Sequence, residues 1–292
     1  MATSIGKAAG NTYLWENNPI TVKQLIIDCG ATKADWCVLE NKTTRTVRTR
    51  GFNLFQTSEE LLSEIIGEAA AQVGPGVEDI HLYAAGLLEK PETDFNKWFP
   101  GAQIEYASDM LGAARAVCGH NPGIAAILGT GANTCEFDGT NIGWKVNCGG
   151  YILGDEGSGA VLGKLFITDY IKNYMPEELL KEVKETYPEL DYLYVVRKVY
   201  GGEAPARYLG SFAPFVLQRY DKYEYVKNLV ETNFRGLFEK TLKQYKPLPV
   251  GVVGGFGYAS REILQRMGKE YGVTFSKFLA TPAEGLAEYH AL

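Results

Sequence analysis

Short apolar runs separated by turn residues occupy the first part of the chain and predict strands. The first run closes with Gly30, and Asn41 and Lys42 separate the second from the third. Short strands joined by tight turns favour an antiparallel meander. The three expected strands are Gln24–Cys29, Ala34–Glu40 and Thr43–Arg50.

The pattern then changes to helical spacing. Thr57 and Glu60 form a capping-box pattern, and the apolar residues after them recur every three or four positions. This predicts a helix from Ser58 to about Val73. The same signals predict further strands at Ile80–Ala85 and Ile104–Ala107, and helices near 91–98 and 109–118.

A second round of strands begins near residue 124. Strands are expected at Ile124–Leu128, Asn133–Phe137 and Ile142–Val146, which resembles the opening meander. The segments LIIDCGATK (25–33) and AAILGTGANT (125–134) both place a glycine and a threonine just past an apolar strand. This weak internal duplication, spaced about one domain apart, indicates two related domains.

The remaining chain is predicted to be mainly helical. Residues 156–245 have a largely helical pattern, followed by a strand at Val250–Val253 and helices at Arg261–Tyr271 and Ala283–Leu292. Residues 1–21 show no periodicity and are expected to be a flexible extension or an added leader. The expected domains are 22–120 and 121–280, the second with a helical insert. The C-terminal helix at about 281–292 is a segment that could pack back on the first domain.

Composition and charge exclude several classes of protein. The 292 residues are 46% hydrophobic and 22% charged, as in globular proteins. The net charge of −6 and the lack of a basic block argue against a nucleic-acid partner. No apolar run approaches the roughly 18 residues of a membrane span, and no secretory signal is evident. We therefore expect a cytoplasmic protein with a small-molecule partner and no membrane partner, and leave a homodimer open.

The cysteines and histidines do not form a recognisable motif. The five cysteines are an odd number without a CxxC pair, and we interpret them as reduced core thiols. The three histidines match no metal or triad spacing and are expected to have ordinary structural roles. These residues are Cys29, Cys37, Cys118, Cys135, Cys148, His81, His120 and His290.

Glycine is over-represented, with 33 residues, and three glycine turns follow apolar strands directly. Such turns direct backbone N–H groups toward one point, which suits the oxygens of phosphate. GSGAVLGKL (157–165) fails as a P-loop at two positions, and GGFGYAS (254–260) lacks the third glycine of a dinucleotide fingerprint. The turns are Gly30 with Ala31, Thr32 and Lys33; Gly129 with Thr130 and Gly131; and Gly254 with Gly255.

Three aspartates lie near these turns. Asp28 ends the first strand and could hold hydrated Mg²⁺ against phosphates, or serve only in the turn. Asp109 opens a helix, as a general base or merely as part of its N-cap. Asp155 lies in the bend GGYILGDEGSG (149–159), where it could also be only a cap.

Five segments that include these turns and aspartates, given at the end of this paragraph, together resemble the N-acetylglucosamine kinase family. The wider group is the BadF/BadG/BcrA/BcrD ATPase family, within the sugar kinase, heat-shock protein and actin superfamily. The resemblance implies an α/β fold of two ribonuclease-H-like (actin-like ATPase) domains with an interdomain cleft. It covers the chain from about residue 23 and rests on IIDCGATKADWCV (26–38), SDMLGA (108–113), ILGTGANTC (127–135), GGYILGDEGSG (149–159) and VVGGFG (252–257).

The resemblance implies a role for each matching residue. Asp28 resembles the metal-associated aspartate, and Asp109 the base that takes the proton from the 6-hydroxyl of a bound sugar. Nucleotide-binding positions are Gly30, Thr32, Lys33, Gly129, Thr130, Gly131, Gly254 and Gly255. Sugar-binding positions are Asn53, Asp109, Gly149, Gly150 and Asp155. The first turn departs from the family's pattern, because Cys29 and Ala31 flank Gly30.

The leading hypothesis is therefore an enzyme that uses ATP and Mg²⁺ to phosphorylate N-acetylglucosamine or a related amino sugar at the 6-hydroxyl. One alternative is an ATPase that activates a 2-hydroxyacyl-CoA dehydratase or benzoyl-CoA reductase, which would hold an iron–sulfur cluster through exposed cysteines. Another is a non-catalytic sugar or nucleotide sensor. Turnover distinguishes an enzyme from a sensor.

Overall fold

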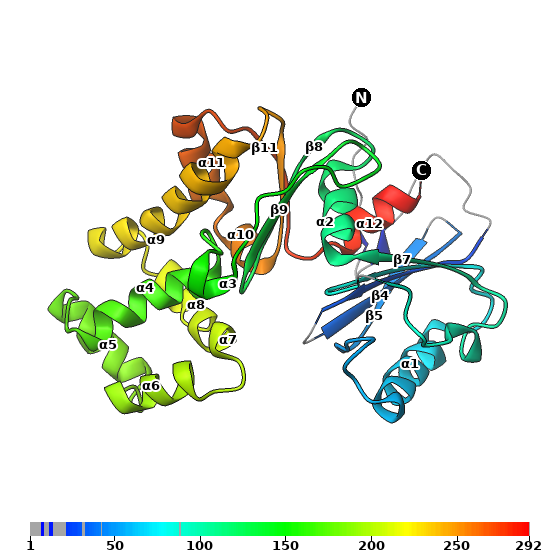
Figure 1. The fold of residues 1–292 in the computed structure, drawn as a ribbon, viewed down its shortest axis with the longest axis horizontal. Coiled ribbons are helices and arrows are strands. Elements are labelled where there is room, and N and C mark those ends of the chain that lie inside the picture. The colour runs from blue at the N-terminus through cyan, green and yellow to red at the C-terminus, as the bar shows by residue number, and fades with distance from the viewer. Residues whose placement is uncertain are drawn as a thin grey trace. The chain divides into compact units, whose positions relative to one another are not determined.

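The computed structural model describes residues 7–8, 12–13, 22–30, 33–41, 43–87 and 89–291. The chain divides into two compact units (Figure 1). The first contains the described residues of Met1–Asn121 together with Gly139–Ile142 and Thr281–Leu292. The second contains Pro122–Asp138 and Gly143–Ala280. Each unit is built around its own sheet.

A five-stranded sheet forms the first unit, in the order β5-β4-β3-β6-β7. The first three strands in the chain are antiparallel neighbours, and β6 and β7 are parallel to β3. The predicted meander is therefore present. The strands are β3 (Gln24–Cys29), β4 (Lys33–Glu40), β5 (Thr43–Arg50), β6 (Asp79–Ala84) and β7 (Gln103–Ser108).

Helix α1 (Glu59–Val73) covers one face of this sheet. Its buried residues recur at helical spacing and pack with the inward side chains of β3, β4 and β6. Ser58 is its N-cap and accepts a hydrogen bond from Leu61 N–H, whereas the hydroxyl of Thr57 accepts one from the backbone N–H of Asn53. The capping role inferred for Thr57 therefore belongs to Ser58.

The opposite face carries α2 (Asp109–Cys118) and α12 (Ala283–His290). These two helices approach so closely that a Cβ at Gly285 would lie 2.2 Å from the carbonyl oxygen of Ala116. Helix α2 also lies close to the sheet, because a Cβ at Gly112 would lie 2.8 Å from the Tyr83 ring of β6. Glycine at both positions is what permits this packing.

The three histidines gather around α12. The rings of His81 and His290 stack with centroids 3.7 Å apart, and His290 Nε2 is 2.7 Å from the Tyr83 hydroxyl. His120 stacks on Tyr289, with centroids 4.2 Å apart. Arg115 of α2 donates to Tyr83 and to Glu105, which also bonds His81. The histidines thus have packing roles at one helix, which their distant sequence positions did not indicate.

The second unit contains a four-stranded sheet in the order β11-β10-β8-β9. Strands β8 and β9 form an antiparallel hairpin, and β10 and β11 continue the sheet in parallel. An antiparallel start followed by parallel strands repeats the topology of the first unit, so the expected α/β fold with two ribonuclease-H-like domains is confirmed. The strands are β8 (Gly123–Leu128), β9 (Ala132–Phe137), β10 (Val250–Val253) and β11 (Phe275–Leu279).

Helices pack on this sheet through one large apolar core, in which β8 and β10 contact residues of α4, α9 and α11. A segment of π-helix, Leu237–Thr241, directly continues α9. The helices are α3 (Gly150–Leu153), α4 (Gly159–Ile171), α5 (Glu177–Thr186), α6 (Tyr192–Tyr200), α7 (Pro205–Gly210), α8 (Ala213–Leu217), α9 (Glu224–Gly236), α10 (Gly255–Ala259) and α11 (Arg261–Tyr271). A short 3₁₀ turn, Leu242–Gln244, follows the π-helix.

Four sequence-based predictions were wrong. The helix expected near 91–98 is only a 3₁₀ turn at Phe95–Lys97, because the N-cap Asp94 has an extended backbone and Pro100 disfavours helical backbone at the residue before it. The strand expected at Ile142–Val146 is not regular: Gly143 and Trp144 form two hydrogen bonds with Glu136. Strand β11 was missed. Within 1–21, two short strands, β1 (Lys7–Ala8) and β2 (Thr12–Tyr13), pair where none was expected, and the rest of that segment lies outside the described residues.

The cysteines are partly as expected. Cys29, Cys37 and Cys135 are buried, Cys118 is half-buried and Cys148 is exposed, so the prediction of core thiols is wrong for Cys148. Among the described residues, no helix combines the length and apolar character needed to cross a membrane.

The packing of α12 on α2 predicts a steric effect on stability. Gly285→Ala should lower the free energy of unfolding by about 1–3 kcal/mol, because its new Cβ would overlap the Ala116 carbonyl. The control is Gly67→Ala in α1, where the nearest atom would be 3.6 Å away and helix propensity should raise stability by about 0.5–1 kcal/mol. Urea unfolding measures both. Equal stability of Gly285→Ala and wild type would contradict this packing.

The histidine cluster predicts that the free energy of unfolding decreases as the pH is lowered. Burial, aided by the charges of His81 and Arg115 and opposed by Glu105, lowers the pKa of His290 to about 3. The unfolded histidine binds a proton near pH 6.5 while the folded one does not, so stability is lost as the pH falls below about 6.5. His290→Gln should therefore reduce the difference in unfolding free energy between pH 7 and pH 5. An unchanged difference would rule out His290 as its source.

Candidate active site

The first glycine turn joins β3 to β4 in the first unit. The N–H of Gly30 donates to the carbonyl of Lys33 at 3.0 Å, which closes the turn. The Lys33 ammonium is half-exposed and lies 3.7 Å from the Asp35 carboxylate, which Arg48 also binds. Lys33 is thus available at the surface of the turn. Thr32, a predicted nucleotide-binding residue, lies outside the described residues.

Asp28 lies next to this turn, near the carboxyl end of β3. Burial raises the pKa of its carboxyl to about 7, and the negative charges of Asp35 and Asp109 add to this effect, while Lys33 opposes it. A carboxylate in such a negative environment is stabilised by a bound cation. Among the described residues, no group of three His, Cys, Asp or Glu side chains is placed to hold a metal ion.

Asp109 is the first residue of α2, directly after β7. Ser108 is the N-cap and accepts a hydrogen bond from Leu111 N–H, so the helix does not depend on Asp109 for its cap. Asp109 Oδ1 accepts a hydrogen bond from the N–H of Met110 at 2.8 Å. Its charge acts on Asp28, which places both carboxylates at the carboxyl edge of the same sheet.

Asn53 follows β5 and organises a turn. Its Oδ1 accepts hydrogen bonds from the N–H groups of Phe55 and Gln56, at 2.9 and 3.1 Å. This local role occupies the carbonyl end of the side chain that the sequence assigned to sugar binding.

The second glycine turn joins β8 to β9 in the second unit. The N–H of Gly129 donates to the carbonyl of Gly131 at 2.9 Å. The first N–H groups of α4, those of Gly159 and Ala160, donate to the carbonyls of Gly129 and Thr130 at 2.9 and 3.0 Å. The turn therefore has a fixed backbone, held by the start of a helix.

Asp155 connects this turn to the bend 149–159. Its carboxylate accepts hydrogen bonds from the backbone N–H groups of Ala132 and Gly150, although burial still raises its pKa. The residue has a left-handed backbone, with φ of 57°, and its side chain is 9% exposed. A Cβ at Gly131 would lie 2.9 Å from Asp155 Oδ2. A left-handed backbone at a residue other than glycine is strained, and such strain persists where surrounding contacts hold the residue in place, often at functional sites.

Gly149 and Gly150 begin the same bend, both with positive φ, of 76° and 69°. They open the short helix α3, whose Tyr151 carbonyl accepts a hydrogen bond from Lys164 of α4 at 2.6 Å. Lys164 therefore anchors the bend that carries the predicted sugar-binding glycines.

Asn233 of α9 was not predicted from the sequence. It is 2% exposed, its Oδ1 accepts a hydrogen bond from Gly157 N–H at 2.9 Å, and its Nδ2 donates to the Ser158 carbonyl at 3.0 Å. Both ends of its amide thus hold the bend next to Asp155. Asn233 lies about 75 residues further along in an ordinary helical pattern, so no local signal identified it.

A pocket of about 480 Å³ opens beside the second turn. The predicted nucleotide-binding residues Gly129, Thr130 and Gly255 all line it. Gly254 lies just before α10, with φ of 122°, and a Cβ there would be 2.4 Å from the Leu128 carbonyl oxygen. The other lining residues are Gly159, Gly210, Ala213, Pro214, Leu217, Gln218, Phe256 and Ala259.

The structure thus groups the predicted residues by unit. Asp28, Gly30, Lys33, Asn53 and Asp109 belong to the first unit. The second unit holds Gly129, Thr130, Gly131, Gly149, Gly150, Asp155, Gly254 and Gly255. Asp28, Gly30 and Asp109 in the first unit, and Gly129 and Gly254 in the second, lie at the carboxyl ends of strands, which is where open α/β sheets bind ligands.

Solved structures of known proteins are similar to this chain. One from Porphyromonas gingivalis, described as a "putative N-acetylglucosamine kinase", has 38% identity and a TM-score of 0.81, covering 91% of this chain and 98% of that chain. One from Chromobacterium violaceum with the same description has 19% identity and a TM-score of 0.66, with coverage of 92% and 98%.

A more distant structure has the same fold. A ROK family glucokinase from Streptomyces griseus, solved with glucose and AMPPNP, is 16% identical with a TM-score of 0.53, and the match covers 92% of this chain and 97% of that chain. No protein-family model and no curated protein sequence matches this chain.

The Porphyromonas gingivalis protein matches almost the whole length of both chains at an identity that indicates common descent. The two-domain fold and the strand-end glycine turns described above agree with that relationship. The chain belongs to the N-acetylglucosamine kinase family and is a sugar kinase.

Proposed function

We propose that this sugar kinase transfers the terminal phosphoryl group of ATP, with Mg²⁺, to the 6-hydroxyl of N-acetylglucosamine or a related amino sugar. The observation that carries the proposal is the pocket of about 480 Å³, in which the second glycine turn and the Gly255 turn meet. The description of the Porphyromonas gingivalis relative as an N-acetylglucosamine kinase supports the choice of sugar.

The nucleotide would bind along this pocket. Thr130 supplies a hydroxyl, and the turn at Gly129 leaves its backbone without side chains that would block phosphate. Phe256, Leu217 and Pro214 supply apolar surface for the base and ribose. The contacts of Gly159 and Ala160 with the turn keep it rigid, which reduces the entropy lost when a ligand is bound.

Asp28 would hold Mg²⁺, as its negative surroundings favour. When bound, the ion neutralises charge on the phosphates. The Lys33 ammonium lies 3.7 Å from the Asp35 carboxylate and is half-exposed, so it would add a second positive charge beside the first glycine turn. Together these residues would place positive charge where phosphoryl transfer needs it.

Asp109 would act as the base for the sugar hydroxyl. A carboxylate within hydrogen-bond reach can orient the 6-hydroxyl and accept its proton as the bond to phosphorus forms. The cap from Ser108 fixes the first turn of α2 and so fixes the position of Asp109. Asp155, anchored to Ala132 and Gly150, would position the bend that contacts the sugar.

The substrate assignment is tested by measuring ATP consumption with Mg²⁺ across hexoses and N-acetylhexosamines, with product mass and position determined by mass spectrometry and NMR. We expect turnover that depends on an N-acetylated sugar and a product phosphorylated at the 6-position. Turnover with other hexoses alone would contradict the substrate assignment. Sugar-independent hydrolysis would favour an activating ATPase, and binding without turnover would favour a sensor.

The base is tested by Asp109→Asn. This variant keeps the shape of the side chain but cannot accept the proton, so kcat should fall by at least about 10²- to 10⁴-fold while ATP still binds. Asp79→Asn is a matched control, because Asp79 is the first residue of β6 and lies at the amino-terminal end of the parallel strands, whereas Asp109 follows their carboxyl end. Near-normal turnover of Asp109→Asn would exclude Asp109 as the base.

A further inference from the structure

The nucleotide pocket has two distinguishable ends. Its sides are formed by the short helices α8 and α10, which both begin near the second glycine turn: a Cβ at Gly159 would lie 3.5 Å from Ala213 and 3.7 Å from Phe256. Each helix then runs away from the glycine turn for five residues, with a rise of about 1.5 Å per residue. Gln218 and Ala259 therefore lie at the end of the pocket away from Thr130.

Gln218 has an unusual character among the lining residues. The others are glycine, alanine, proline, leucine, phenylalanine and threonine, so only Gln218 and Thr130 carry side-chain hydrogen-bonding groups. Within the part of the chain that the structure describes, no side-chain hydrogen bond of Gln218 occurs, while its backbone N–H donates to the Pro214 carbonyl. An amide with two donors and an acceptor is thus available in an otherwise apolar site.

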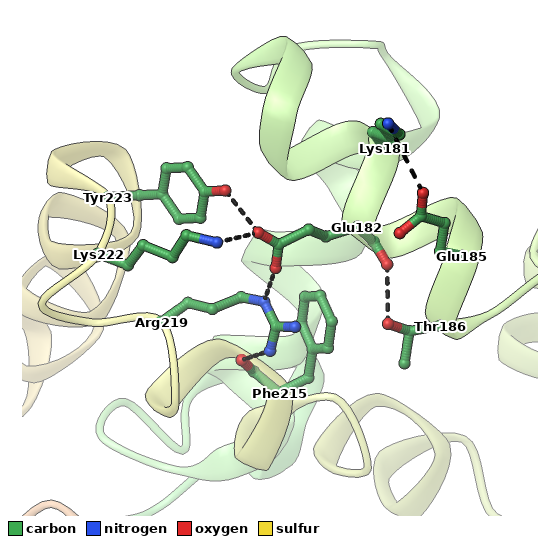
Figure 2. A network of polar contacts seen from close by, with 8 residues as sticks. All are labelled: Lys181, Glu182, Glu185, Thr186, Phe215, Arg219, Lys222 and Tyr223. Atoms are coloured by element: carbon green, nitrogen blue, oxygen red, sulfur yellow. Dashed lines mark hydrogen bonds and ion pairs between the residues drawn. The ribbon is translucent and has the colours of Figure 1, made fainter.

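A network of charges holds the backbone next to Gln218 in place (Figure 2). The Glu182 carboxylate of α5 accepts a hydrogen bond from Arg219 Nε at 2.7 Å, another from the Tyr223 hydroxyl at 2.7 Å, and a third from Lys222. These contacts lower the pKa of Glu182 to about 2. All three donors come from the segment that directly follows Gln218.

Arg219 also fixes the helix that carries the pocket wall. Its Nη1 donates to the Phe215 carbonyl at 3.0 Å, and its guanidinium lies over the Phe215 ring, 3.4 Å from the centroid. Phe215 packs on Phe166 of α4, with ring centroids 5.7 Å apart. Arg219 therefore links the backbone next to Gln218 to both α5 and α4. These contacts fix the position from which the Gln218 side chain extends.

We propose that Gln218 reads the base of the nucleotide and selects adenine. The inference rests on the proposed function, since it requires phosphates at the Thr130 end of the pocket. A glutamine amide can accept a hydrogen bond from adenine N6 and donate one to N7, as it does when proteins read adenine in DNA. Guanine presents two acceptors, O6 and N7, at the same edge, so the amide cannot form both bonds.

The test replaces the Gln218 amide by a group that can only donate hydrogen bonds. Gln218→Lys keeps a side chain of similar length and suits the two acceptors, O6 and N7, that guanine presents at this edge, whereas the N6 amino group of adenine offers it no acceptor. Calorimetry with AMPPNP and GMPPNP gives the ratio of the two dissociation constants. We expect wild type to prefer AMPPNP, and the variant to shift this ratio toward GMPPNP by about tenfold, the effect of roughly 1.4 kcal/mol.

Gln265→Lys is the matched control, because Gln265 is exposed on α11 and does not line the pocket. It adds the same charge and should leave the ratio unchanged. Thermal unfolding confirms that each variant is folded. A Gln218→Lys variant that keeps the wild-type preference for AMPPNP would overturn the inference. Absence of sugar phosphorylation by the wild type would instead contradict the proposed function, because the binding ratio does not depend on turnover.

A second variant tests the supporting network separately. Glu182→Gln retains the shape of the side chain and removes its charge, so the segment that carries Gln218 should be held less firmly. We expect a several-fold rise in KM for ATP with little change in kcat. Glu185→Gln, on the same helix and 4.0 Å from Lys181, should change neither. A loss of kcat at unchanged KM would overturn a positioning role of Glu182.

Discussion

Two backbone hydrogen bonds, from Gly159 and Ala160 to the carbonyls of Gly129 and Thr130, underlie the arrangement of the second unit. They satisfy N–H groups that the first turn of a helix leaves without partners, and at the same time they fix the turn after β8. A Cβ at residue 159 would lie 3.2 Å from the Gly129 carbonyl oxygen, a tight contact that glycine avoids. Helices α8 and α10 can then pack beside α4 and enclose the pocket.

The bend 149–159 is held at several points by residues distant in sequence. The Asp155 carboxylate bonds the backbone beside the second turn, Asn233 holds Gly157 and Ser158, and Lys164 holds Tyr151. The π-helix that follows α9 lies against the same bend, since a Cβ at Gly157 would be 2.8 Å from Leu237. Such multiple restraint explains how Asp155 keeps a left-handed backbone, and a bend fixed in this way would lose little conformational entropy on binding a ligand.

Local patterns in the sequence predicted most strands and turns well, because strands buried on both faces, such as β3, β4, β8 and β10, are short continuous apolar runs bounded by turn residues. They failed where the local geometry is irregular: the segment near 91–98 forms only a 3₁₀ turn after the N-cap Asp94, and β11 has a register shift opposite Val250 that breaks its alternation. The glycine turns were predictable because a glycine after an apolar strand is a local signal. Asn233 and Gln218 were not, since their positions depend on helix packing that no neighbouring residue reveals.

The division of the chain between the units has a practical consequence for protein engineering. The first unit takes Gly139–Ile142 and Thr281–Leu292 from beyond its main segment, so no continuous piece of the gene encodes it. A fragment ending near Asn121 would lack α12 and would expose to water the face of α2 around Ala116, together with the rings of Tyr83 and His81. Expression of this unit alone would need the α12 sequence joined to the end of α2, which is an internal deletion of the second unit rather than a truncation of the chain.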